Sequence, residues 1–186
     1  AAVRLCKGAG YRNAGTVEFL VDVDANEFYF IEVNPRIQVE HPVTEAVTGI
    51  DLVREQIAIA AGRELSIRQR DVRPSGHAIE CRLNARQAGT IERWQVPGGD
   101  GVRVDTHCHD GYVVPPYYDA LLGKLIVWSA TRDAALDGMR RVLLDSSIEG
   151  IETNLPLQRT IVEHPDFAAG RVTTHWLEDL LTGAVA

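Results

Sequence analysis

Two glutamates and an asparagine are the residues whose spacing most strongly suggests chemistry. Residues 15–33 are expected to form a β-hairpin, because two segments rich in β-branched and aromatic residues flank a turn centred on Ala25. In that register Glu18 lies opposite Glu32, and Asn34, two residues beyond Glu32, points to the same face. The hairpin is therefore expected to bring two carboxylates and an amide together.

Two carboxylates that face each other across a β-ladder repel, so this arrangement needs something to offset it. A divalent cation between them is the simplest explanation. Carboxylate and amide oxygens suit Mg²⁺ or Mn²⁺, which also bind substrate phosphates. The alternative is that both glutamates point to solvent and that Asn34 only starts a turn. A turn one residue longer or shorter would also make the pair diagonal.

A dense polar loop follows the hairpin. Residues 34–42 contain two prolines, which restrict the backbone around Arg36, Gln38 and Glu40. Arg36 offers a planar fork for a carboxylate-like or phosphate-like anion. Glu40 is a potential general base if its surroundings hold it near a substrate proton. The loop and the hairpin together suggest chemistry on phosphate and a small oxyanion. The alternative is a solvated loop with an Arg–Glu ion pair.

The remaining pattern predicts an α+β chain that positions this hairpin and loop. A helix is expected after Asp51, a suitable N-cap, with Val53 and Ile57 on one face and an end at Gly62. After residues 63–75 the pattern changes to strands and then to helices. The expected strands are 76–83, 90–96, 101–106 and 121–128, and the expected helices are 133–144, 154–163 and 174–181.

Composition places the chain among globular proteins. Of its 186 residues, 45% are apolar and 24% are charged, which argues against disorder. The net charge of −7 argues against a nucleic-acid partner. No apolar run approaches the ~18 residues that a membrane-spanning helix needs. The three cysteines, Cys6, Cys81 and Cys108, suggest reduced thiols in a cytoplasmic protein. The chain starts without methionine inside an apparent helix, so a piece of a longer protein is expected.

The motif Glu32-Val33-Asn34-Pro35-Arg36, with Glu18 upstream, resembles the metal-binding end of ATP-grasp ligases. Its continuation over residues 37–45, Ile-Gln-Val-Glu-His-Pro-Val-Thr-Glu, resembles biotin carboxylase, the ATP-dependent component of acetyl-CoA, propionyl-CoA and pyruvate carboxylases. Carbamoyl-phosphate synthetases share the Glu-x-Asn-Pro-Arg core but not the Gln-Val-Glu-His continuation. Further similar stretches are residues 76–84, 97–99, 115–119 and 150–154.

The resemblance implies a fold and an activity. Residues 1–65 would be the C-terminal half of an ATP-grasp domain, and residues 66–186 a biotin carboxylase C-terminal domain. The parent protein would be an ATP-dependent carbon–nitrogen ligase that carboxylates biotin on a carrier protein, using bicarbonate. Acetyl-CoA carboxylase of fatty acid biosynthesis is one such system, and the sequence leaves the acyl acceptor open. Implied partners are the biotin carboxyl carrier protein, a carboxyltransferase and a second copy of the chain.

The resemblance also implies roles for the hairpin residues. Glu18, Glu32 and Asn34 match metal-binding residues, and both glutamates would also lie near the ATP phosphates. Leu20 matches an apolar contact to the adenine. ATP and Mg²⁺ or Mn²⁺ are thus the expected ligands of this part of the chain.

In the loop, Arg36 matches the catalytic arginine that holds bicarbonate and carboxyphosphate. Gln38 and the backbone of Val39 match bicarbonate contacts, and Glu40 matches the base that deprotonates bicarbonate. Arg82 matches the arginine that stabilises the biotin enolate. Without the resemblance, Arg82 would be expected only to pair with a glutamate two residues away on its strand.

Two departures from the family pattern bear on activity. The family's ATP-clamping lysines and glycine-rich lid lie upstream of this chain's first residue, so the isolated chain is expected to be inactive. The stretch 84–90 is several residues shorter than is typical for the family, either because the loop is trimmed or because residues are missing from it. Other possibilities are a different ATP-grasp ligase, such as carbamoyl-phosphate synthetase, or a non-catalytic domain for dimerisation or docking.

Some residues that could do chemistry are expected to be structural. Cys6 and Cys81 are expected to be small buried residues rather than nucleophiles. Tyr117 and Tyr118, beside two prolines, are expected to serve in packing.

Overall fold

The computed structural model describes residues 1–183 and contains two compact units, Ala1–Ser75 and the residues from Gly76 onward. Both units contain helices and strands, so the α+β class predicted from the sequence is confirmed. Residues 66–75, assigned above to the second domain, lie in the first unit. There the backbone N–H of Ser75 donates to the carbonyl of Val47 at 2.8 Å.

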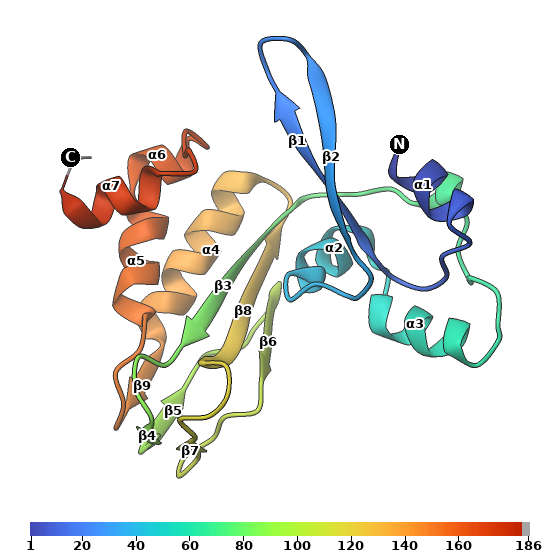
Figure 1. The fold of residues 1–186 in the computed structure, drawn as a ribbon. Helices are drawn as coiled ribbons and strands as arrows, with labels where there is room; N and C mark the ends of the chain where they lie inside the picture. Colours follow the sequence, from blue (N-terminus) through green and yellow to red (C-terminus); the bar gives the residue numbers. More distant parts are fainter. Residues whose placement is uncertain (184–186) are drawn as a thin grey trace. The chain divides into compact units, whose positions relative to one another are not determined.

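The first unit consists of a long hairpin and short helices. Its elements are α1 (Ala2–Gly8), β1 (Thr16–Asp22), β2 (Glu27–Asn34), α2 (His41–Thr48), α3 (Leu52–Ala60) and the 3₁₀ turn η1 (Gln69–Asp71). β1 and β2 form a two-stranded antiparallel ribbon that extends beyond the helices of this unit (Figure 1). As predicted, Asp51 caps α3, and its side chain accepts from the N–H of Arg54 at 2.8 Å.

The first unit buries little of its apolar surface. Pro42 is the only buried residue among its described residues. Leu20 on β1 is 63% exposed, and Phe28 on β2 is also exposed. Val53 and Ile57 share one face of α3, as expected, but that face is exposed as well. Apolar periodicity identifies which face of an element is apolar, whereas only the tertiary structure shows whether anything covers it.

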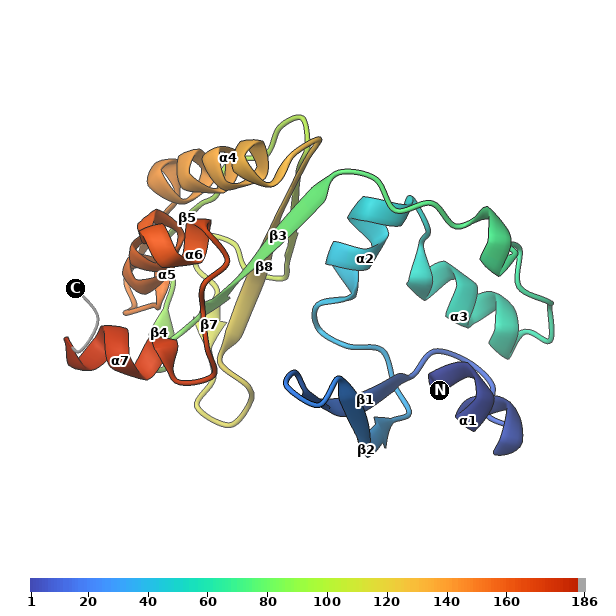
Figure 2. The same cartoon turned by 90° about the horizontal axis from the view of Figure 1, so that it is seen from above.

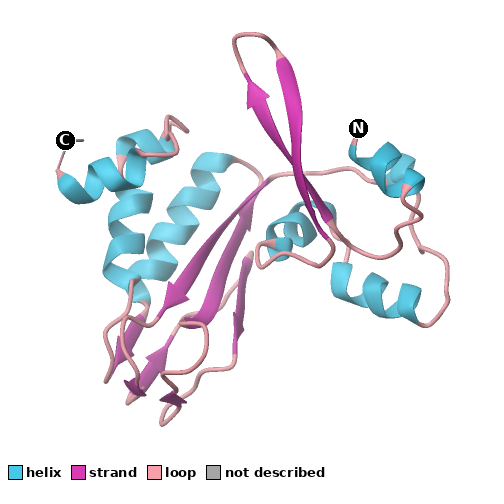
Figure 3. Ribbon diagram, in the orientation of Figure 1, coloured by secondary structure: helices cyan, strands magenta, loops and turns pink. Residues whose placement is uncertain are grey.

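The second unit is built on a three-stranded antiparallel sheet. From one edge to the other its strands are β3 (His77–Asn84), β8 (Leu121–Ser129) and β6 (Val102–Thr106). The helices α4 (Arg132–Asp145) and α5 (Leu155–Glu163) cover one face of this sheet (Figures 2 and 3). The three strands and two helices agree with the predicted elements to within a few residues.

Side chains alternate across β3 in a way that defines the core. Cys81 and Leu83 are buried with residues of α4, whereas Glu80 and Arg82 point to the opposite face of the sheet. Thr131 caps α4 by accepting from the N–H of Ala134 at 3.2 Å. The core on the helix-covered face comprises Ile79, Cys81, Leu83, Leu125, Val127, Ala135, Leu136, Met139, Val142, Leu143, Leu155 and Val162.

Truncating the centre of this core should be costly. Leu83 is 0% exposed, so Leu83→Ala removes buried methyl groups and leaves a cavity, and we expect the free energy of unfolding to fall by about 2–5 kcal/mol. Urea denaturation measures this change. Leu144 on α4 is 72% exposed, and Leu144→Ala, the same chemical change, should cost less than about 0.5 kcal/mol. Equal losses in the two variants would contradict this assignment of the core.

One predicted strand is wrong. Residues 90–96 form two short strands rather than one, because the chain bends at Glu92. Ile91, just before the bend, is buried in a second small cluster. β4 (Gly89–Thr90) pairs with β7 (Val113–Val114), and β5 (Arg93–Gln95) pairs with β9 (Ser147–Glu149). β7 and β9 are too short for a periodicity signal, so the sequence did not indicate them.

The described chain closes with α6 (Pro165–Ala168) and α7 (Trp176–Thr182), the latter predicted as 174–181. Trp176 is buried and packs edge-on against His164, with ring centroids 5.1 Å apart. This contact attaches α7 to the residue that precedes α6.

Candidate functional site

The predicted pairing of Glu18 with Glu32 is confirmed, but the hairpin reaches it by a different route. Asp22 pairs with Glu27, so the turn is centred one half-residue earlier than Ala25. Continued without interruption, that register would place Glu18 opposite Ile31 and turn Glu32 to the other face of the hairpin. A β-bulge between Glu18 and Phe19 absorbs one residue of β2 and restores the opposed pair.

Asn34 joins the two carboxylates. Its Nδ2 donates to Oε1 of Glu18 at 2.7 Å and to Oε1 of Glu32 at 3.2 Å. The structure therefore brings together the three residues that the sequence singled out. Two carboxylates and an amide are a donor set that fits Mg²⁺ or Mn²⁺, because both ions prefer hard oxygen ligands. To ligate a cation, the amide would have to present its oxygen in place of its nitrogen.

A third carboxylate at this position should increase the dependence of stability on divalent cations. In Asn34→Asp the hydrogen bonds to both glutamates are lost and three like charges meet, so we expect a loss of about 1 kcal/mol without cations. Mg²⁺ or Mn²⁺ should reverse this loss. Thermal unfolding with EDTA and with each cation measures the difference. Asn26→Asp makes the same change at the turn of the same hairpin, and an equal cation response in both variants would argue against a cation site.

The polar loop ends earlier than predicted, because α2 begins at His41. Pro42 occupies its first turn, where a missing N–H costs no helical hydrogen bond. Within the loop, Nη1 of Arg36 donates to Oε1 of Gln38 at 2.8 Å and to the carbonyl of Ile37 at 3.1 Å. Nδ1 of His41 lies 2.7 Å from the carbonyl oxygen of Gln38. These contacts stiffen the loop around the arginine.

Three of the loop residues singled out by the sequence line one hollow. A cavity of about 320 Å³ in the first unit contains Arg36, Gln38 and Glu40 in its wall. Val39 is half-buried, and Leu20 lies further along β1 with its side chain exposed. The hollow thus combines a cation, an amide and a carboxylate, which is a suitable set for a small oxyanion that must lose a proton. The lining residues are Ala14, Gly15, Thr16, Arg36, Ile37, Gln38, Glu40, His41, Thr44 and Leu52.

Arg82 lies in the second unit, on the face of the sheet opposite α4. Its side chain is 46% exposed, and its Nε lies 3.7 Å from Oε1 of the buried Glu80 side chain. The neighbour across the ladder is Lys124 of β8. The ion pair with Glu80, proposed as the structural alternative for Arg82, is therefore present at a distance longer than a hydrogen bond.

Lys124 is a residue that the sequence reasoning missed. It is only 8% exposed, and its Nζ lies 3.5 Å from Oδ2 of Asp105. Burial raises the pKa of Asp105, but the hydrogen bond from Arg103 and the charges of Arg103 and Lys124 outweigh it, so the pKa is lowered. The sequence did contain a signal, namely a lysine inside the apolar strand that ends at Ser129. A lysine in such a strand is expected to be buried, and a buried lysine almost always has a partner of opposite charge.

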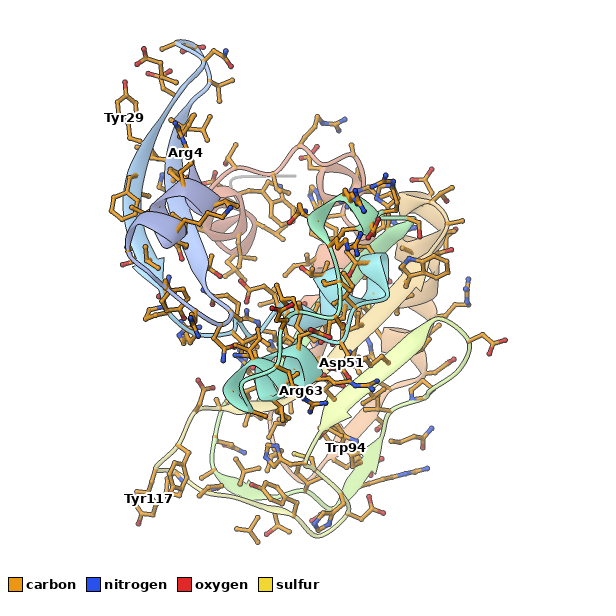
Figure 4. All side chains as sticks on the ribbon, turned by 90° about the vertical axis from the view of Figure 1, so that its right-hand side faces the viewer. Arg4, Tyr29, Asp51, Arg63, Trp94 and Tyr117 are labelled. Carbon is orange, nitrogen blue, oxygen red and sulfur yellow. The ribbon has the colours of Figure 1, made fainter. Side chains whose placement is uncertain are left out.

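The expectation of buried cysteines is met by Cys81, whereas Cys6 is half-buried. Burial raises the pKa of the Cys81 thiol to about 12, with a smaller contribution from Glu80. The aromatic pair differs from expectation: Tyr117 is 86% exposed and points away from its loop (Figure 4), and Tyr118 is also exposed. A run of prolines shapes a loop but does not provide anything to pack against it.

Stability should fall in alkaline solution because of Cys81. Its pKa is higher in the folded protein than the ordinary thiol value, so the folded state holds its proton longer than the unfolded chain does. Above about pH 9 the free energy of unfolding should decrease by up to about 1.4 kcal/mol per pH unit. Urea titrations at several pH values measure the slope. It should be shallower in Cys81→Ala than in Cys6→Ala, and equal slopes would contradict the assignment.

None of the helices within residues 1–183 has the length and apolar character needed to cross a membrane.

Each of the two units matches a known protein family model. A family model described as the biotin carboxylase C-terminal domain matches residues 80–179. A second model, described as the carbamoyl-phosphate synthase L chain ATP binding domain, matches residues 1–68. Biotin carboxylase 1 of Bacillus subtilis is 49% identical over 96% of this chain, and the biotin carboxylase of Pseudomonas aeruginosa is also 49% identical over 96%. The chain spans 41% of the length of each of these relatives.

Solved structures agree with the sequence relatives. The biotin carboxylase domain dimer of Hydrogenobacter thermophilus 2-oxoglutarate carboxylase, in complex with MgADP, ADP and bicarbonate, matches with a TM-score of 0.93 and 46% identity. The match covers 100% of this chain and 42% of that one. Rhizobium etli pyruvate carboxylase matches with a TM-score of 0.90 and 38% identity, over 95% of this chain and 18% of that one. One family model spans more than half of the chain and the relatives are nearly half identical, and the chain therefore belongs to the biotin carboxylase family.

Proposed function

We propose that this chain forms part of an enzyme that carboxylates biotin on a carrier protein, using ATP and bicarbonate. The observation that carries the proposal is the convergence of Glu18, Glu32 and Asn34 on one face of the hairpin. That hairpin leads directly into the loop whose Arg36 and Glu40 line a hollow suited to an oxyanion. The solved relative described with MgADP and bicarbonate supports the same pairing of ligands.

In this proposal the hairpin serves the nucleotide. Glu18, Glu32 and Asn34 would hold Mg²⁺ or Mn²⁺, and a bound cation would supply positive charge to the ATP phosphates. Leu20, exposed on β1, would contact the adenine. The opposed glutamates are tolerated in the free protein because the Asn34 amide donates to both.

The loop would serve bicarbonate. Glu40 takes the bicarbonate proton, an oxygen of the resulting dianion attacks the γ-phosphorus of ATP, and ADP leaves, which forms carboxyphosphate. Arg36 would neutralise the anion throughout, and Gln38 and the backbone of Val39 would orient it. Nη1 of Arg36 is held by the loop, so the other N–H groups of the guanidinium remain to face the anion.

Arg82 would act in the second half of the reaction. Carboxyphosphate breaks down to CO₂ and phosphate, the phosphate accepts the proton of the biotin ureido nitrogen, and that nitrogen then attacks CO₂. Negative charge builds up on the ureido oxygen as the proton leaves. A fixed guanidinium stabilises such an enolate-like oxygen.

We also propose that the chain works within a longer polypeptide, with residues 1–65 as part of an ATP-grasp domain and the residues from Gly76 onward as the biotin carboxylase C-terminal domain, so that residues 66–75, which lie in the first unit, connect the two. The exposed apolar side chains of β1, β2 and α3 support this, because such faces are normally covered. Isolated residues 1–186 would then be inactive. The three free thiols support a cytoplasmic location.

The proposed partners are a biotin carboxyl carrier protein, a carboxyltransferase and a second copy of the chain. We propose acetyl-CoA carboxylase, and so fatty acid biosynthesis, as the system that it serves. Some relatives are named as parts of pyruvate and 2-oxoglutarate carboxylases. The acceptor of the carboxyl group therefore has to be identified by experiment.

The proposal is tested by measuring ATP hydrolysis that depends on bicarbonate and biotin. Two samples are compared: this chain, and the same chain extended at its N-terminus to include a complete ATP-binding domain. Activity in the extended form alone is expected. Activity in neither form would favour a non-catalytic dimerisation or docking domain, and activity in the short form would contradict the need for an additional domain.

A further inference from the structure

The stretch 150–154 resembles the family, yet the site described above gives it no role. In the structure it lies beside the exposed edge of the central sheet. Within the described residues β3 is an edge strand of its sheet, and only an isolated antiparallel bridge, Ala85–Thr153, lies next to its end. The backbone groups of Arg82 and Asn84 that point away from β8 therefore have no regular strand to pair with. Such groups need partners from elsewhere in the unit.

Asn154 supplies most of these partners. Its Nδ2 donates to the carbonyl oxygen of Arg82 at 3.0 Å, and its Oδ1 accepts from the N–H of Asn84 at 2.8 Å. Its own backbone N–H donates to the carbonyl of Asn84 at 3.0 Å. The side-chain amide thus copies one rung of a β-ladder. Gln158, one turn further along α5, adds a second donor to the carbonyl of Arg82 at 3.2 Å.

Helix capping does not account for this residue. Asn154 stands at the N-cap of α5, where asparagine usually accepts a hydrogen bond from the helix itself, but its side chain makes no such bond. Thr153 provides the acceptor for the start of the helix instead, because its Oγ1 accepts a hydrogen bond from the N–H of Leu155 at 3.3 Å. The amide of Asn154 is directed at the backbone of Arg82 rather than at its own helix.

We propose that Asn154, assisted by Gln158, is a positioning residue that sets the direction of the Arg82 guanidinium toward biotin. This inference rests on the proposed function. The Arg82 side chain is 46% exposed, and its Nε lies 3.7 Å from Oε1 of Glu80 on the same strand. The backbone of Arg82 that Asn154 and Gln158 hold sets the point from which this side chain extends. A shift of about 1 Å in a positioned group can cost about 10²-fold in rate.

The test uses the extended protein and separates two activities: carboxylation of free biotin, and bicarbonate-dependent ATP hydrolysis without biotin. In Asn154→Asp the donor to Arg82 becomes a second acceptor, while the acceptor for Asn84 is kept. We expect kcat for biotin carboxylation to fall about 10-fold or more, while hydrolysis without biotin stays within about 2-fold. Gln158→Ala removes only the second donor, and a fall of about 2- to 5-fold is expected, so the test does not depend on one variant folding.

A double-mutant cycle with Arg82→Gln distinguishes positioning from general destabilisation. If Asn154 acts through Arg82, Asn154→Asp has little further effect once Arg82 is replaced. Thr131→Ala, which removes the cap of α4 in the same unit, is the control for lost stability and should alter neither activity more than about 2-fold.

Additive losses in the cycle, or equal losses of both activities in Asn154→Asp, would overturn the inference and leave the proposed function intact. A parent protein with no biotin-dependent activity, or an Arg82→Gln variant with full activity, would instead refute the proposed role of Arg82 and the inference with it.

Discussion

Replacing Glu32 by glutamine is expected to lower kcat for bicarbonate-dependent ATP cleavage by about 10²- to 10³-fold in the extended protein. The substitution keeps the size of the side chain and removes one of two charges that face each other across the hairpin. Charge placed where a transition state develops its own charge is worth a factor of this order. Steady-state ATP hydrolysis at saturating Mg²⁺ and bicarbonate measures the effect.

The loss in Glu32→Gln should be accompanied by weaker cation binding. Removing one carboxylate also removes the repulsion with Glu18, so the free protein should be as stable as the parent or slightly more stable. Glu27→Gln is the matched control, because Glu27 lies on the same strand. Within the described residues, the hydrogen bond that its side chain accepts is the one from the Tyr29 hydroxyl. A variant with full ATP cleavage, or an equal loss in Glu27→Gln, would show that the opposed carboxylates do not serve the nucleotide.

Arg82→Gln is expected to separate the two halves of the reaction. Biotin carboxylation should fall by about 10²-fold, because the enolate-like oxygen loses its cation. Bicarbonate-dependent ATP cleavage without biotin should change little, because the residues proposed for that step lie on the hairpin and its loop. The transfer of label from bicarbonate to free biotin measures the first activity. The release of phosphate from ATP in the absence of biotin measures the second.

A second arginine provides the control for Arg82. Arg93 on β5 pairs with Glu149 across the ladder at 3.7 Å and is exposed. Arg93→Gln is the same chemical change in the same unit and should leave both activities within about 2-fold. If Arg82→Gln lowered ATP cleavage and biotin carboxylation equally, Arg82 would act on a step common to both, and its assignment to biotin would be wrong.

Much of the fold and the candidate site follows from local sequence patterns. Alternation over residues 76–83 and the helical period over 133–144 predicted β3 and α4, because side-chain burial imposes these periods directly on the sequence. The segment from Glu32 to Glu40 indicated the polar loop from its prolines and charged residues, and its resemblance to a known motif indicated the family. These features depend only on neighbours along the chain.

Other features required the tertiary structure. The turn at Asp22–Glu27 differs from the predicted one, and the opposed glutamates are restored only by a bulge, which depends on how both strands pair over their length. Apolar periodicity on α3 could not indicate that its face is exposed in this unit.

The contact between Asn154 and the backbone of Arg82 joins residues 72 positions apart. No local pattern encodes such a contact, because it arises only when α5 packs beside the edge of β3. The burial of Lys124 has the same origin, since its partner Asp105 lies on a different strand. The sequence by itself thus determined the chemistry available to this protein and the elements that carry it. The tertiary structure decided the register of its carboxylates and the support of its arginine, because both depend on contacts between segments distant in the chain.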